Sequence, residues 1–210
     1  MFCATVRPGL ELRLLEERHA PTLFNLVDRE RPYLREWLPW VDGTLAEDDS
    51  LAFIKASLEQ FANNNGFAAG IWDTSGNADP RPPVGFASTD RDDGWGLTSE
   101  AGNQPHFAGV IGTHKINWAN RKVELGYWIA REFQGNGIMT DACRVVVTHL
   151  LRELDLNRVE ILCGTGNEKS CAIPRRLGFT LDGTLREGEL CSGRYLDLHV
   201  FGMLKRDWHP

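Results

Sequence analysis

The chain has 210 residues, of which 42% are hydrophobic and 25% are charged, and its formal net charge is −6. This length suits one domain with a full hydrophobic core and is short for two. The acidic balance argues against sequence-independent nucleic-acid binding, which needs clustered Lys and Arg. No apolar run approaches the length of a membrane span. We therefore expect a single globular domain that binds neither nucleic acid nor membrane.

The five cysteines are scattered and include no C-x-x-C pair, so the sequence predicts no zinc site. Their odd number and irregular spacing are typical of a reduced, cytosolic protein. The first ten residues lack a basic region followed by a long apolar run, which is the pattern of a signal peptide. A cytoplasmic protein without a metal is the expectation.

In the first half of the chain, alternation predicts a strand over residues 10–14 and a helix that starts near Pro21. An aromatic segment with two prolines covers residues 31–40. A capping-box pattern at residues 44–47 predicts the start of a second helix, which runs to about Asn64. A strand over residues 67–72 follows.

Residues 73–105 differ in kind, since they are rich in Gly, Pro, Asp, Ser and Asn and carry little periodicity. A segment of this length is too long for an ordinary connection between strands. We expect an insertion, either a functional flap or a disordered segment, and the composition favours disorder.

Regular patterns resume after the insertion. The periodicity predicts strands at 110–116, 123–129 and 158–163, a helix at 140–154, and a short helix at 170–177 that Gly178 closes. Two final strands, 179–185 and 195–204, are expected to be joined by a loop with two glycines. The order predicts one mixed α/β domain over residues 1–210.

The strongest motif is a strand, then Gly135-Asn136-Gly137, then a helix. Glycines allow a ligand to approach the backbone, and the start of a helix offers unpaired N–H groups and a partial positive charge. The turn is thus a candidate phosphate or pyrophosphate site. The chain contains no P-loop string, and Thr140 stands where a dinucleotide-binding fingerprint needs its third glycine, so both of those classes are disfavoured.

Residues 123–129 followed by residues 134–140 resemble the acetyl-CoA signature of the GNAT acetyltransferase superfamily, with Met139 where the family has Gly or Ala. Residues 33–40, 167–170, 176–179, 181–186 and 193–197 are similar, in the same order, to the RimJ/RimL-type subfamily. The resemblance spans roughly residues 10–205. It implies the GNAT fold: a central mixed, mostly antiparallel sheet with a splayed strand pair and helices on both faces.

The resemblance also implies acetyl-CoA, or another short acyl-CoA, as co-substrate, and direct transfer of the acyl group to a primary amine. The pantetheine arm is expected to pair with the backbone of the strand before the turn, and the turn is expected to hold the pyrophosphate. The implied CoA-binding residues are Tyr127, Trp128, Ile129, Gln134, Gly135, Asn136, Gly137, Ile138, Met139, Thr140, Asn167 and Ser170.

Three residues are candidates for the chemistry. Glu124 and Glu189 lie where relatives place a base, and the alternatives are a solvated strand carboxylate for Glu124 and a surface loop charge for Glu189. Ser170 falls where the subfamily places a donor near the CoA sulfur, and a role in capping a helix competes with that role. Trp37 and Trp40 are expected either to line the acceptor site or to join an aromatic cluster in the core or at a dimer interface. His114 and His149 are expected to be structural.

Three functions remain open at this point. The acceptor is a protein N-terminal α-amine in the first, and a small amine or an aminoacyl conjugate in the second. The third is a CoA-binding protein without catalysis. Because relatives of this type frequently form dimers, a homodimer is one expected assembly.

Overall fold

The computed structural model describes residues 3–75 and 105–209. Most of the predicted insertion, residues 76–104, lies outside the described residues, so its predicted disorder stays a prediction. Among the described residues, no helix is long and apolar enough to cross a membrane.

The described chain forms one eight-stranded sheet in the order β1-β2-β3-β4-β5-β6-β8-β7. Every neighbouring pair is antiparallel except β5 and β6, which are parallel. The strands are β1 Cys3–Arg7, β2 Leu10–Leu14, β3 Ala68–Asp73, β4 His106–Thr113, β5 Lys122–Ile129, β6 Arg158–Gly164, β7 Thr180–Cys191 and β8 Arg194–Leu204.

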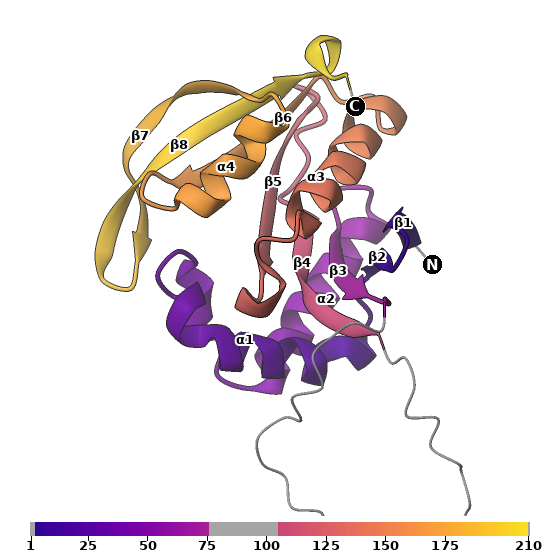
Figure 1. Cartoon of the computed structure of the whole chain (residues 1–210), viewed down its shortest axis with the longest axis vertical. Helices are drawn as coiled ribbons and strands as arrows, with labels where there is room; N and C mark the ends of the chain where they lie inside the picture. Colours follow the sequence, from indigo (N-terminus) through magenta and orange to yellow (C-terminus); the bar gives the residue numbers. More distant parts are fainter. Residues whose placement is uncertain (1–2, 76–104, 210) are drawn as a thin grey trace, which may run out of the picture.

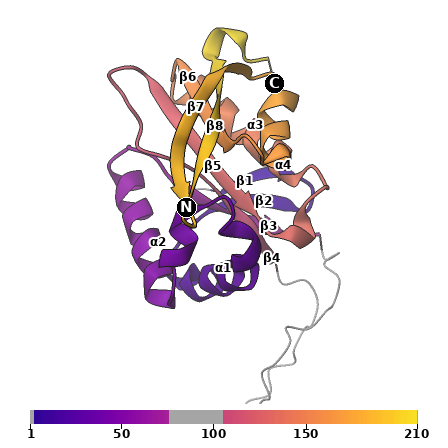
Figure 2. The same cartoon turned by 90° about the vertical axis from the view of Figure 1, so that its left-hand side faces the viewer.

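Four helices cover the two faces of this sheet, α1 and α2 on one side and α3 and α4 on the other (Figures 1 and 2). They are α1 Ala20–Leu34, α2 Glu47–Ala62, α3 Ile138–Thr148 and α4 Glu168–Arg176. Helix α3 continues into a single wide turn, His149–Glu153. The predicted mixed, mostly antiparallel fold with helices on both faces is confirmed.

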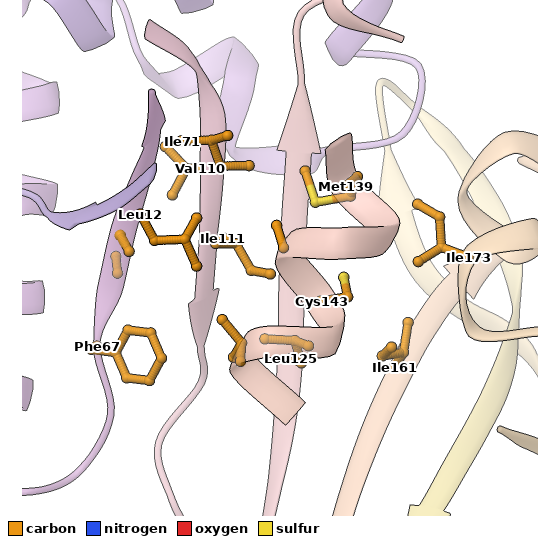
Figure 3. Packing of buried hydrophobic residues seen from close by; sticks show 14 of the residues in the cluster. Leu12, Phe67, Ile71, Val110, Ile111, Leu125, Met139, Cys143, Ile161 and Ile173 are labelled. Carbon is orange, nitrogen blue, oxygen red and sulfur yellow. The ribbon is translucent and has the colours of Figure 1, made fainter. Parts of the chain in front are cut away.

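The core is built from the alternating apolar residues of the strands and the inner stripe of α3. Figure 3 shows Met139 and Cys143 of α3 above the strand residues Ile111 and Leu125. All four side chains are at most 5% exposed. Burial raises the pKa of the Cys143 thiol well above its ordinary value. Cys143 is therefore a packing residue, as its apolar helical pattern predicts.

Several boundaries differ from the sequence expectation. Strand β1 lies outside the predicted elements, because only the two residues Ala4 and Val6 carry its apolar alternation and the other positions are exposed. Helix α2 begins at Glu47, three residues after the predicted cap at Thr44. The reason is that the Asp49 carboxylate accepts from the backbone N–H groups of Leu45 and Ala46 at 2.8 and 2.9 Å and so defines a later start.

The C-terminal hairpin departs further from the prediction, since the expected loop at residues 186–194 is mostly strand. β7 continues to Cys191, and only Ser192 and Gly193 make the turn into β8. The register shifts between Leu185 and Glu189, and Glu187 has a φ of 50°. Residues 186–188 have no partner in the register of β8 and form a bulge. A bulge of this kind changes the direction of the side chains after it.

Candidate active site

The sheet opens where β5 and β6 diverge. The two strands are paired only from Lys122 to Glu124, against Arg158 to Glu160. Beyond that point β5 pairs with β4 alone, up to Ile129, and β6 pairs with β8. Figure 1 shows the resulting divergence. The N–H and C=O groups on one side of residues 125–129 thus have no strand partner among the described residues, and an extended ligand with amide groups can occupy that position.

The glycine turn lies at the open end of β5 and leads into α3. Gly135 and Gly137 have φ angles of 83° and 74°, in the left-handed region that favours glycine. A Cβ added at Gly135 would meet no heavy atom within 4 Å. Gly137 is the N-cap of α3, so the first N–H groups of the helix lack helical partners. Ile138 and Met139 are buried, which means that the turn presents its backbone to a ligand.

These features fit the pyrophosphate of CoA. The turn is also tied to α4, since Lys169 Nζ donates to Gln134 Oε1 at 2.9 Å. Met139, the one departure from the signature, packs into the core at 5% exposure, so its side chain does not obstruct the turn.

Residues of β5 alternate between the two faces of the sheet. Tyr127 points toward α4, where its hydroxyl donates to the Ser170 carbonyl at 3.2 Å. Burial raises the pKa of Tyr127 well above its ordinary value, so this phenol stays protonated. Glu124, Gly126 and Trp128 point to the opposite face.

On that opposite face, two carboxylates and an imidazole gather around Gly126. His114 Nε2 lies 3.5 Å from Glu124 Oε1, and a Cβ added at Gly126 would lie 3.6 Å from the same nitrogen. The pKa of Glu189 on β7 is raised, mainly by burial and then by the negative charge of Glu124, while His114 acts in the opposite direction. A carboxylate with a raised pKa accepts a proton more readily near neutral pH.

Aromatic residues from the segment after α1 border the same face. The rings of Trp40 and Trp128 are 6.2 Å apart, and the Trp40 side chain is 42% exposed. Trp37 packs on the end of β6 and on the chain just after it, where Cβ atoms added at Gly164 and Gly166 would lie 3.2 and 3.4 Å from its ring. The Arg194 guanidinium lies 5.6 Å above the Trp37 ring. A depression of about 460 Å³ next to Trp37 is lined by Pro32, Arg35, Glu36, Ser192 and Arg194.

Ser170 is not the helix cap that the sequence offered as the alternative. Asn167 is the N-cap of α4, and its side-chain oxygen accepts from the Ser170 N–H at 3.2 Å. Ser170 is half-buried, and its carbonyl accepts from Tyr127.

Comparison with known proteins decides the family. The model of the Acetyltransferase (GNAT) domain matches residues 9–180. The chain belongs to the GNAT acetyltransferase family. It is an N-acetyltransferase that takes the acetyl group from acetyl-CoA and transfers it to an amine.

Individual relatives extend over nearly the whole chain. "Putative ribosomal N-acetyltransferase YdaF" of Bacillus subtilis is 34% identical over 99% of this chain and 98% of its own. The ribosomal-protein-serine acetyltransferase of Escherichia coli is 24% identical over 95% of this chain and 94% of its own. The solved structure of the acetyltransferase RimL in complex with coenzyme A has a TM-score of 0.80 at 24% identity and covers 97% of this chain and 98% of its own, which supports the fold.

In this GNAT acetyltransferase the sequence-predicted residues form two groups, one on each side of β5. The glycine turn, Tyr127 and Ser170 lie on the α3–α4 side, while Glu124, Trp128 and Trp40 lie on the other. Glu189 was expected in a loop, but it lies on β7, where burial and the charge of Glu124 raise its pKa.

Sequence reasoning undervalued one residue on the second face. His114 was expected to be structural, yet its side chain is 67% exposed and contacts Glu124. A signal was present, since His114 directly follows β4 and the hairpin brings it opposite β5. Among the described residues, no group of three or more His, Cys, Asp or Glu side chains is arranged to hold a metal ion.

Proposed function

We propose that the protein acetylates the α-amine of a protein N-terminus. Support comes from two relatives that match this chain over nearly their whole length and whose names specify ribosomal acetylation. The observation that carries the proposal is the Glu124–Glu189 pair on the side of β5 opposite the glycine turn, bordered by Trp40 and Trp128. An extended peptide end fits an open face with aromatic walls better than it fits an enclosed cavity.

The roles follow from position. The turn from Gln134 to Thr140 holds the pyrophosphate, and the pantetheine arm lies along Tyr127 to Ile129, with Asn167 and Ser170 beside it. Glu189 accepts the proton of the acceptor ammonium, directly or through water, and its pKa is raised by burial and then by the charge of Glu124.

The neutral amine then attacks the thioester carbonyl, a C–N bond forms, and the C–S bond breaks with the electron pair leaving on sulfur. The nitrogen loses its extra proton, and the thiolate takes up one proton to leave as free CoA. The Ser170 hydroxyl donates a hydrogen bond to the departing thiolate.

The test uses the purified protein, acetyl-CoA and three kinds of acceptor: peptides with a free N-terminal serine, the same peptides with a blocked N-terminus and an internal lysine, and free polyamines. Mass spectrometry locates the acetyl group. We expect acetylation of the free N-terminus alone. Faster acetylation of polyamines or of lysine side chains would refute the proposal and favour the small-amine alternative.

We also propose that residues 1–210 form one acyltransferase domain, with residues 73–105 as an insertion. Support comes from the direct pairing of Asp73 with His106, because the segment leaves and rejoins the sheet at adjacent strand ends. A cytoplasmic location and a homodimer are part of the same proposal, by analogy with bacterial relatives that modify ribosomal proteins. Light scattering of the purified chain tests the dimer.

A further inference from the structure

Arg7, at the end of β1, reaches the glycine turn from the opposite end of the sequence. Its Nη1 donates to Asp141 Oδ2 at 2.6 Å, and its Nη2 donates to the Asn136 carbonyl at 3.1 Å. One partner is the central residue of the turn and the other lies in the first turn of α3. A single guanidinium thus connects the N-terminal hairpin to both parts of the site, and its planar fork suits such a double contact.

Asp141 places a negative charge in the first turn of α3, next to the proposed pyrophosphate site. The start of α3 offers N–H groups and a partial positive charge to an anion. A carboxylate in the same helical turn opposes that effect, since it repels a negatively charged pyrophosphate. A Cβ added at Gly137 would lie 3.9 Å from both Arg7 Nη1 and Asp141 Oδ2, so the ion pair lies directly beside the turn.

We propose that Arg7 is a positioning residue for CoA, which fixes the Asn136 peptide and neutralises Asp141 beside the pyrophosphate. The inference rests on the proposed CoA turn and adds a residue outside the family signature. Both side chains of the pair are partly exposed, at 42% and 36%, so its effect on affinity weakens as salt rises.

The test is a double-mutant cycle read by titration calorimetry with acetyl-CoA. Arg7→Gln is expected to raise the Kd roughly tenfold, about the loss of one charge-assisted hydrogen bond. Asp141→Asn alone is expected to change the Kd little, because Arg7 still binds the Asn136 carbonyl. The double variant should bind more tightly than Arg7→Gln, because the unpaired carboxylate is gone. Arg7→Lys, which keeps the charge, should fall between wild type and Arg7→Gln.

Arg144→Gln is the matched control, because it removes the same charge from an exposed position on α3, three residues beyond Asp141. An equal loss in Arg144→Gln and Arg7→Gln would show a general effect of charge and overturn the proposal. A double variant as weak as Arg7→Gln would overturn the neutralising role of Arg7. If Arg7→Gln misfolds in circular dichroism, Arg7→Lys against wild type is decisive: Lys keeps the charge but not the planar fork, and an unchanged Kd would overturn the role of Arg7 in fixing the Asn136 peptide.

Failure of this inference is distinguishable from failure of the site. If Arg7→Gln binds acetyl-CoA as wild type does while Gly137→Val loses binding, then the turn stands and Arg7 has no role in it. If neither variant loses affinity, the CoA turn itself is wrong.

Discussion

Gly137→Val tests the CoA turn most directly. Gly137 has a φ of 74°, and an L-residue in the left-handed region costs roughly 1–2 kcal/mol, with a further penalty for a β-branched side chain. The new Cβ would point toward the Arg7–Asp141 pair at 3.9 Å, and its methyl groups would reach further. The substitution therefore distorts the turn that presents the N–H groups of α3.

Gly178→Val is the matched control. Gly178 has a φ of 77°, and a Cβ there would have its nearest neighbour at 4.0 Å, in the Met203 side chain. The two variants impose similar backbone strain, and we expect each to reduce the free energy of unfolding by about 1–3 kcal/mol. Gly178 ends α4, whereas Gly137 begins α3, so only one of the two strained positions belongs to the CoA turn.

The expected effect on binding is larger than the effect on folding. Each charge-assisted hydrogen bond lost to the pyrophosphate costs about 1.5–3 kcal/mol, which weakens the Kd by roughly ten- to a hundredfold. Circular-dichroism melting measures the fold, and titration calorimetry measures acetyl-CoA binding. A folded Gly137→Val that binds acetyl-CoA as tightly as Gly178→Val does would refute the assignment of the turn.

Three other predictions follow from the opposite face and from the insertion. Activity that needs unprotonated Glu189 falls as pH drops through its raised pKa. Because Glu124 raises the pKa of Glu189, Glu124→Gln should move the acidic limb of the kcat/KM profile to lower pH. Because His114 lowers that pKa, His114→Gln should move the limb to higher pH. Shifts in the same direction would contradict the Glu189 assignment. Trp40→Ala should raise the KM of the acceptor peptide and leave the Kd of acetyl-CoA unchanged. A change in the Kd of acetyl-CoA alone would show that Trp40 contacts the donor and not the acceptor. Deletion of residues 76–104 should leave the melting temperature within about 5 °C of wild type, since Asp73 and His106 are already paired; a collapse of the melting transition would show that the segment is needed for folding.

The sequence was informative where the pattern is local. The two glycines with positive φ, the closing Gly178 and the helix that follows the turn were predicted from residue type and spacing, because backbone chemistry at those positions leaves few choices. The mostly antiparallel sheet with helices on both faces followed from the resemblance to a known fold, which periodicity alone does not supply.

The rest depends on contacts between distant segments. Glu189 was assigned to a loop because two glycines follow Arg186 within a few residues, and the bulge that keeps it on a strand depends on pairing with β8. The roles inferred for His114 and Arg7 depend on their partners. His114 contacts Glu124 of β5, and Arg7 of β1 contacts Asp141 of α3, so each pair joins separate elements. A local sequence pattern does not predict such pairs. For Ser170, the alternative role as a helix cap falls away because Asn167, three residues earlier, performs that role.

The divergence of β5 from β6 has a consequence for how the enzyme could diversify. In the proposed site, residues 125–129 would recognise the donor through main-chain groups, which side-chain substitutions other than proline leave in place. On the other face of the strand, the Trp128 side chain borders the Trp40 ring and plays no part in that main-chain pairing, so this position can change with the acceptor. Under this proposal one strand separates a constant requirement from a variable one: its peptide backbone would pair with the amide groups of the donor arm, and a side chain on its other face would adapt to different amines.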